Sequence, residues 1–172
     1  MNDAMSMGVH RLWKDEFVGS LRPGAKGPMR CIDLAGGTGD IALRILDYAR
    51  ENYADRETSV DVVDINPEML KEGYKRFKKI MYHNSSYLLG LARDNVAHRE
   101  LAPQVAFIES NAQALPQEQF PDNTYDLYTI AFGIRNCTSV QDVLKEAYRV
   151  LKPGGTFACL EFSKVDNPLF GM

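Results

Sequence analysis

The chain has 172 residues, 45% of them hydrophobic and 25% charged, and its formal net charge at pH 7 is −3. This length suffices for one domain with its own core, and the small charge gives no general attraction to nucleic acid. No apolar run approaches the length of a membrane span, and no secretory signal peptide is evident. The three cysteines lack the C-x-x-C spacing of metal sites, so we expect buried free thiols in a reducing compartment and no metal.

The first predicted element is a helix near the N-terminus, where apolar residues recur at helical spacing: Val9, Leu12, Trp13, Phe17 and Leu21. We expect this helix to pack on the edge of the domain, with Trp13 as its anchor. The alternative is that Asn2, Asp3 and His10 belong to a lid over a ligand site. A turn region rich in Pro and Gly follows at residues 22–28.

The stretch CIDLAGGTGD, residues 31–40, is the centre of the predicted fold. An apolar run leads into three glycines and an acid, and an apolar stripe on a helix follows: Ile41, Ala42, Ile45, Leu46 and Ala49. Glycine allows positive φ and the close approach of a ligand, and the start of a helix offers unpaired N–H groups. The stretch therefore predicts a strand, a tight turn and a helix that hold a small, nucleotide-like molecule.

The acids beside this turn indicate which kind of nucleotide binds. Asp33 and Asp40 flank the glycines, and two carboxylates repel a pyrophosphate. They favour a ligand with positive charge and no phosphate, and S-adenosylmethionine, with its sulfonium and amino groups, fits this description. The alternative is a structural glycine turn with two structural acids.

A second strand is predicted at residues 59–64, and it ends in Asp64, 25 residues after Gly39. An acid at this position accepts hydrogen bonds from ribose hydroxyls; the alternative is a strand-end acid in a turn. Asn66 is expected to cap a helix that runs from Pro67 to about residue 81. We interpret the basic residues of that helix as a solvated face, with contact to a membrane surface or an acidic partner as the alternative.

Further strands are predicted at residues 104–110, 125–132 and 156–162, and a helix over residues 140–151 ends at the sequence KPGG. The segment 83–99 is longer than a compact α/β connection needs. This alternation of strands and helices predicts an α/β fold, with a parallel sheet that helices cover on both faces. Asn111 follows the third strand, where a side chain can meet an adenine edge.

Several stretches follow the opening MNDAMSMGVHRLWK in a characteristic order: GGTGD, VVDINPEML, ESNAQALP, TIAFGIRN, RVLKPGG and LEFS. Over nearly all of the chain, except residues 50–59 and 83–99, the sequence resembles the ubiquinone/menaquinone biosynthesis C-methyltransferases. These are class I enzymes that depend on S-adenosylmethionine. The amino-acid sequences of these motifs are more similar to the fungal mitochondrial branch of the family than to the bacterial branch.

The resemblance implies a Rossmann-like class I methyltransferase sheet, mostly parallel, in a single domain over residues 1–172. Residues 1–28 are expected to form an N-terminal helix or lid, and residues 29–172 the α/β core. The resemblance also implies a fragment that lacks both ends and whose sheet is truncated after strand 5. The implied reaction is methylation of a ring carbon of a polyprenylated methoxy-benzoquinol in ubiquinone biosynthesis.

For a eukaryotic member, the resemblance implies a location in the mitochondrial matrix, peripheral to the inner membrane. The implied partners are other subunits of a ubiquinone-synthesis complex and a second copy of the chain in a homodimer. Two other functions stay open: a non-catalytic, cofactor-binding subunit of such a complex, and an NAD-type oxidoreductase. The acids beside the glycines oppose the oxidoreductase.

The expected contacts to S-adenosylmethionine come from the glycine loop and from the strand ends that follow: Asp33, Gly36, Gly37, Thr38, Gly39, Asp64, Ile65, Asn111, Ala112 and Ala131. Ala131 stands where bacterial members of the family often carry a serine. For catalysis we single out Arg135 and Asn136, which leave the fourth predicted strand on the cofactor side.

We expect Arg135 to stabilise a phenolate or to orient a water that takes the proton, and Asn136 to hold the ring oxygen. The alternative is that Arg135 pairs with Asp3 or Glu161 and only braces its loop. Asp3, His10 and Glu161 are weaker catalytic candidates.

Overall fold

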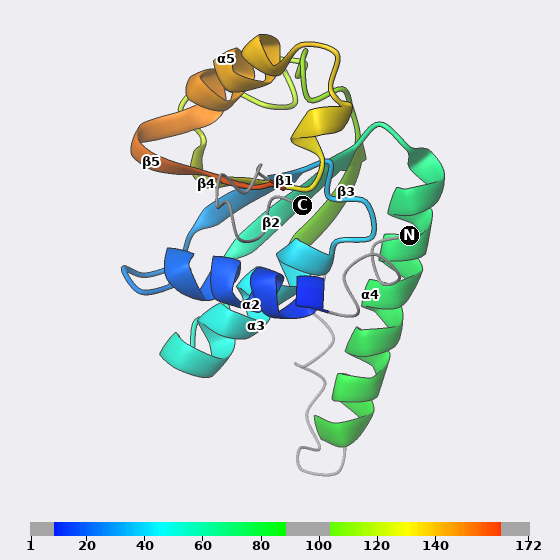
Figure 1. Ribbon diagram of the computed structural model, residues 1–172. Coiled ribbons are helices and arrows are strands. Elements are labelled where there is room, and N and C mark those ends of the chain that lie inside the picture. Colours follow the sequence, from blue (N-terminus) through cyan, green and yellow to red (C-terminus); the bar gives the residue numbers. More distant parts are fainter. Residues whose placement is uncertain (1–8, 89–103, 163–172) are drawn as a thin grey trace, which may run out of the picture.

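The computed structural model describes residues 9–88 and 104–162. Its elements follow in the order α2 (Val9–Leu21), β1 (Arg30–Leu34), α3 (Asp40–Tyr53), β2 (Ser59–Asp64), α4 (Pro67–Leu88), β3 (Val105–Glu109), β4 (Tyr125–Ala131), η1 (Ile134–Asn136), α5 (Val140–Val150) and β5 (Leu151–Leu160). The five strands form a parallel sheet in the order β3-β2-β1-β4-β5 (Figure 1). The predicted α/β fold with a parallel sheet is confirmed.

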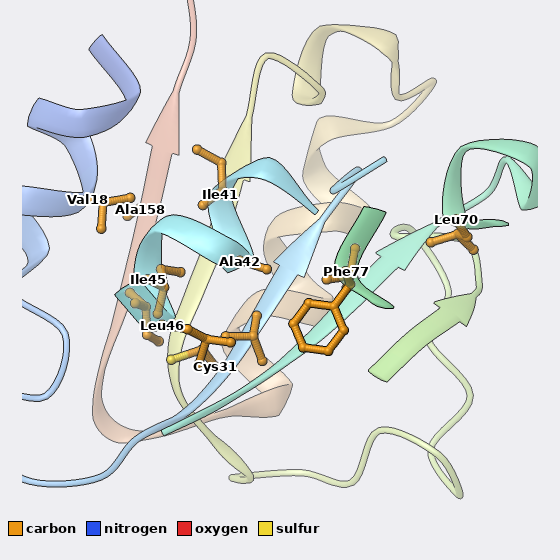
Figure 2. Packing of buried hydrophobic residues seen from close by; sticks show 12 residues of the cluster. Val18, Cys31, Ile41, Ala42, Ile45, Leu46, Leu70, Phe77 and Ala158 are labelled. Carbon is orange, nitrogen blue, oxygen red and sulfur yellow. The ribbon is translucent and has the colours of Figure 1, made fainter. Parts of the chain in front are cut away.

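Helices cover both faces of the sheet, with α2, α3 and α4 on one face and α5 on the other (Figure 1). Because side chains alternate along a strand, Cys31 enters the core on the α3 side and Ile32 the core on the α5 side. Figure 2 shows the first of these cores, where Ile45 and Leu46 of α3 are buried. Burial on both faces explains the almost continuous apolar runs of the inner strands.

The strand order places β1 in the middle of the sheet. The chain runs outward from β1 to β2 and β3, and then returns to the other side of β1 with β4 and β5. In such a sheet the loops diverge at the carboxyl ends of the central strands and leave a crevice between them. The loops after β1, β2, β3 and β4 therefore meet at one edge, which is where a ligand site is expected.

Two element boundaries differ from the sequence prediction. Helix α4 continues to Leu88 rather than ending near residue 81, because neither Gly nor Pro interrupts residues 82–88. Strand β5 begins at Leu151, which was predicted to end the preceding helix, and an irregular register carries the pairing from Leu151 to Thr156. Proline is tolerated in this stretch because β5 lies at the edge of the described sheet, where a missing N–H is harmless. The remainder of segment 83–99 lies outside the described residues.

The predicted N-terminal helix is present as α2, and Phe17 and Leu21 of the predicted stripe pack against the core, but Leu12 and Trp13 do not. Trp13 is exposed, whereas His10 and Val18 are buried. The side chain of Lys14 lies between them on the same face and is also mostly buried. The prediction of Trp13 as the anchor of this helix is therefore wrong, because the most deeply buried residues of α2 lie on the line of Lys14, one residue away from it. Cys159 is also exposed, contrary to the expectation of buried thiols.

Gly73 fixes how closely helix α4 approaches the glycine loop. A Cβ atom at this position would lie 2.6 Å from Cε1 of Phe107 and 3.0 Å from the backbone of Thr38. We expect Gly73→Ala to lower the free energy of unfolding by about 2 kcal/mol, because the overlap outweighs the gain in helix propensity. Urea denaturation measures this change.

The matched control is Gly19→Ala in helix α2, where the nearest atom to a Cβ would be Cε2 of Tyr48 at 3.8 Å. This substitution also replaces a helical glycine, but it meets ordinary contact distances. It should raise the free energy of unfolding by up to about 1 kcal/mol. Stabilisation of both variants would show that α4 can move away from the loop without cost.

Candidate functional site

A cavity of about 320 Å³ lies at the carboxyl ends of the central strands. Each of the loops that follow β1, β2, β3 and β4 contributes to its wall, as does the first turn of α4. Its lining consists of Ala35, Gly37, Val63, Asp64, Ile65, Met69, Ser110, Asn111, Ala112, Gln113, Phe132, Gly133, Asn136 and Cys137. This is the crevice that the strand order predicts.

The glycine loop after β1 is held by hydrogen bonds to the end of β2. The amide of Gly36 donates to the carbonyl oxygen of Val63 at 3.2 Å, and the amide of Gly37 donates to Oδ2 of Asp64 at 2.9 Å. Gly37 and Gly39 have φ angles of 53° and 73°, which favour glycine because a Cβ atom would be strained there. The turn is therefore built around the carboxylate of Asp64.

The carboxylate of Asp64 is fixed but not saturated. Its Oδ2 accepts from Gly37, and its Oδ1 accepts from the amide of Asn66 at 2.8 Å. Because each carboxylate oxygen has two lone pairs, one acceptor position remains on each oxygen. Asp64 also lines the cavity. A diol, such as the two hydroxyls of a ribose, can donate to both positions at once.

The rest of the cavity wall contains both apolar and polar side chains. Ile65 and Met69 are exposed on one side, and Met69 belongs to the first turn of α4, which Asn66 caps as predicted. Asn111 follows β3, and its Oδ1 accepts the amide of Gln113 at 3.0 Å. A flat apolar ring with polar edges, such as adenine, suits this combination.

Asp40 does not face the cavity. Its Oδ2 accepts from Nζ of Lys14 at 2.9 Å and from Arg44 at 3.5 Å, and its Oδ1 accepts from Arg76 at 3.3 Å. Burial by itself raises the pKa of Asp40, but the hydrogen bonds and charges of Lys14 and Arg76 lower it overall. This carboxylate is neutralised by cations of α2, α3 and α4, so it does not repel a ligand in the cavity.

Asp33 lies beneath the glycine loop and is fully buried. Its Oδ1 accepts from the hydroxyl of Thr129 at 2.7 Å, and its Oδ2 has no hydrogen-bond partner among the described residues. Burial raises the pKa of Asp33 to about 7. The interpretation that Asp33 and Asp40 repel a pyrophosphate is therefore wrong, and Asp64 is the carboxylate that lines the cavity.

The charge of the lining still selects among nucleotides. No Lys or Arg occurs among the described residues that line the cavity, and Asp64 supplies a negative charge. A phosphate would meet this carboxylate without a cation to balance it. A cationic adenosyl compound without phosphate fits this lining, because its positive charge is attracted to the carboxylate. Within the described part of the chain, no group of three His, Cys, Asp or Glu residues could hold a metal ion.

Arg135 and Asn136 lie in η1, the single turn that follows β4. Asn136 lines the cavity, whereas Arg135 is exposed and donates to Oε1 of Glu161 at 2.7 Å. The guanidinium of Arg135 also lies 5.0 Å from the centroid of the Phe162 ring. The predicted alternative, an ion pair with Glu161, is thus present, and Asp3 lies outside the described residues.

The predicted site residues divide into two groups. Those that line the cavity are Gly37, Asp64, Ile65, Asn111, Ala112 and Asn136. Those that support it from behind or beside are Asp33, Gly36, Thr38, Gly39, Ala131 and Arg135, and His10 is buried in α2. Sequence reasoning missed the other residues of the lining, which are Ala35, Val63, Met69, Ser110, Gln113, Phe132, Gly133 and Cys137. The rule that ligands bind beyond the carboxyl ends of parallel strands could have found Phe132, Gly133 and Ser110.

Comparison with known proteins gives one family. The sequence profile of the "ubiE/COQ5 methyltransferase family" matches residues 1–172. A mitochondrial 2-methoxy-6-polyprenyl-1,4-benzoquinol methylase of Schizosaccharomyces pombe is 54% identical over 166 residues, which cover 96% of this chain and 48% of that protein. The methylase of the same name in Drosophila melanogaster is 50% identical, over 97% of this chain and 50% of that protein. The chain thus spans about half the length of these curated relatives.

Bacterial relatives and solved structures agree with this result. The ubiquinone/menaquinone biosynthesis C-methyltransferase of Bartonella henselae is 45% identical, over 98% of this chain and 55% of that protein. A SAM-dependent methyltransferase from Aquifex aeolicus has a TM-score of 0.61 at 21% identity, over 90% of this chain and 66% of that one. The methyltransferase CalH, solved with SAH, has a TM-score of 0.57 at 16% identity, over 86% of this chain and 34% of that one. At these identities the solved structures support the fold alone.

Proposed function

The chain belongs to the ubiE/COQ5 methyltransferase family, and on that premise we propose that it methylates a ring carbon of a 2-methoxy-6-polyprenyl-1,4-benzoquinol with S-adenosylmethionine. The names of the relatives supply the substrate. The observation that carries the proposal is the carboxylate of Asp64, held by two amides in a cavity whose described lining has no cation. This arrangement fits an adenosyl group without phosphate.

The residues of the cavity can hold each part of the cofactor. Asp64 accepts the ribose hydroxyls, and Gly37 has no side chain to block the approach. Ile65 and Ala112 offer apolar surface to the adenine, and Asn111 offers a polar edge. Bound here, S-adenosylmethionine supplies a methyl group activated by its sulfonium.

Asn136 and Arg135 provide the groups that the substrate needs. A ring carbon becomes a good nucleophile only when a neighbouring phenol loses its proton, so negative charge develops on a ring oxygen. Asn136 lines the cavity and can donate its amide N–H to that oxygen. Arg135 stays protonated, so it cannot be the base, but it can stabilise the phenolate or orient a water that takes the proton. Only one of its five N–H donors is needed for the bond to Glu161.

The proposal extends to the location of the protein. Relatives in three eukaryotes are named mitochondrial, and we place this chain in the mitochondrial matrix, peripheral to the inner membrane. No helix in the described part of the chain is long and apolar enough to cross a membrane. Other subunits of a ubiquinone-synthesis complex and a second copy of the chain are the partners we propose. Co-purification from mitochondria, followed by sizing of the purified chain, tests both.

Calorimetric titration tests the cofactor. We expect S-adenosylmethionine to bind and NADH not to bind. Asp64→Ala should weaken the binding of S-adenosylmethionine about a hundredfold, because two hydrogen bonds to a charged acceptor, each about 1.5 kcal/mol, are lost. The control is Asp61→Asn, because Asp61 lies in the same strand but bonds the hydroxyl of Tyr125 at 2.6 Å, away from the cavity.

The outcomes separate the candidate functions. Binding of NADH in place of S-adenosylmethionine would point to an oxidoreductase. Binding of S-adenosylmethionine without methyl transfer to a prenylated methoxyhydroquinone would point to a non-catalytic, cofactor-binding subunit. Equal loss of affinity in the Asp61 and Asp64 variants would show that neither carboxylate contacts the cofactor directly.

A further inference from the structure

Three aromatic rings form a row that leads from the cavity to the surface. Phe132 lines the cavity and is 8% exposed. Its ring packs against that of Phe162, with centroids 4.9 Å apart. Phe162 in turn meets the ring of Trp13 edge-on at 5.9 Å. The row therefore joins the loop after β4, the end of β5 and helix α2.

The outer members of this row are not part of the core. Phe162 is 50% exposed and Trp13 is 39% exposed, although the buried stripe of α2 lies one residue away. Large aromatic side chains that stay in contact with water next to a ligand cavity commonly mark a binding surface. Helix α2, which carries Trp13, is joined to the start of α3 because the adjacent Lys14 donates a hydrogen bond to Asp40.

The chemistry beside the row indicates what it binds. The guanidinium of Arg135 lies 5.0 Å from the Phe162 centroid. A phenolate that this guanidinium stabilises would therefore lie next to the aromatic row. The wall near Asn111 and Gln113 is polar, and Ile65 and Met69 flank the end of the cavity that holds Asp64. An apolar chain attached to the ring can therefore leave the cavity along Phe132, Phe162 and Trp13.

We propose that the row of Phe132, Phe162 and Trp13 is the subsite for the polyprenyl tail of the substrate. Helix α2 is then part of the substrate site through Trp13. The inference rests on the proposed function, since it takes the tail from the polyprenyl benzoquinol. Burial of isoprenoid carbons against the exposed parts of these aromatic side chains provides affinity that the quinol ring alone lacks.

Two ligands that differ only in the tail test the subsite: 2-methoxy-6-geranyl-1,4-hydroquinone and unprenylated 2-methoxy-1,4-hydroquinone, each titrated in saturating S-adenosylhomocysteine. Trp13 is the single tryptophan of the chain, so its emission reports contact directly. We expect the geranyl compound to bind at least about tenfold more tightly and to change the emission, since the buried methylene and methyl groups contribute affinity. The unprenylated compound should leave the emission unchanged.

Phe162→Ala is the variant that separates tail from ring. It should weaken binding of the geranyl compound about tenfold and leave the unprenylated compound and S-adenosylmethionine unaffected. Trp13→Ala, followed by calorimetry, should act in the same way. The control is Tyr148→Ala, which removes an 88% exposed ring on α5, outside the cavity lining.

The results distinguish this inference from the proposed function. If S-adenosylmethionine and the unprenylated compound bind but the geranyl group adds no affinity, the subsite is wrong and the function stands. If Phe162→Ala weakens both hydroquinones equally, the row contacts the ring rather than the tail, which also overturns the subsite. If neither S-adenosylmethionine nor either hydroquinone binds, the proposed function and the subsite fail together.

Discussion

Replacement of Arg135 by alanine is expected to lower turnover about a thousandfold, or about 4 kcal/mol in the activation barrier, while S-adenosylmethionine binds as before. In the proposed mechanism the guanidinium stabilises the negative charge that develops on the ring oxygen, and Arg135 belongs to the same turn as Asn136. Loss of this stabilisation affects the transition state more than the bound substrate, so kcat should fall and KM should change little. Steady-state kinetics with a prenylated methoxyhydroquinone measures the effect.

The ion pair with Glu161 provides the matched control. Glu161→Gln removes the charge that holds Arg135 but leaves the guanidinium in place. Turnover should then fall less than about tenfold, since an exposed ion pair contributes little to stability. If Glu161→Gln is as damaging as Arg135→Ala, the arginine only braces its loop. Near-normal turnover in Arg135→Ala would also remove it from catalysis.

Stability should fall as the pH rises from about 4 to about 7, because of Asp33. In the unfolded chain this carboxyl loses its proton near pH 4, whereas burial raises its pKa in the folded protein to about 7. Between these values the folded state binds more protons, so each pH unit lowers the free energy of unfolding by about 1.4 kcal/mol. The loss reaches at most about 4 kcal/mol above pH 7.

Asp33→Asn isolates this contribution, because the amide does not ionise. Urea denaturation from pH 4 to pH 8 measures the free energy of unfolding of both proteins. Relative to the original protein, the variant should become more stable as the pH rises. Thr129→Val is the matched second variant. It removes a hydrogen bond that lowers the pKa of Asp33, so the pH range over which stability falls should extend above pH 7. A difference that is independent of pH would show that Asp33 ionises normally.

Local sequence signals predicted the framework of the fold and the main element of the candidate site. The glycine loop and Asp64 could be predicted as neighbours of the candidate site because a tight turn requires glycines and a strand end can be recognised in the local sequence. The role of Asp40 could not be found in this way. Its cationic partners Lys14 and Arg76 belong to two other helices, and no spacing rule joins them.

Other errors have similar physical causes. Trp13 was expected to anchor α2, but His10 and Lys14 lie on the inward face, and Lys14 does so because its partner Asp40 belongs to α3. The length of α4 was underestimated because its last turns carry no stop signal. Phe132 was assigned to the end of a strand and left out of the site, although ligands bind beyond the carboxyl ends of parallel strands.

The cavity is made by loops from four neighbouring strands, of which β1 and β4 pair in the sheet although they are far apart in the sequence, and this governs when the cavity forms. Asp33 of β1 and Thr129 of β4 meet across 96 residues of chain, so much of the sheet must be paired before its walls exist. Such long-range pairing is the slow part of folding. A ligand that occupies the finished cavity therefore binds only the native state. By mass action it protects the whole sheet against unfolding, and not merely the loops that it contacts.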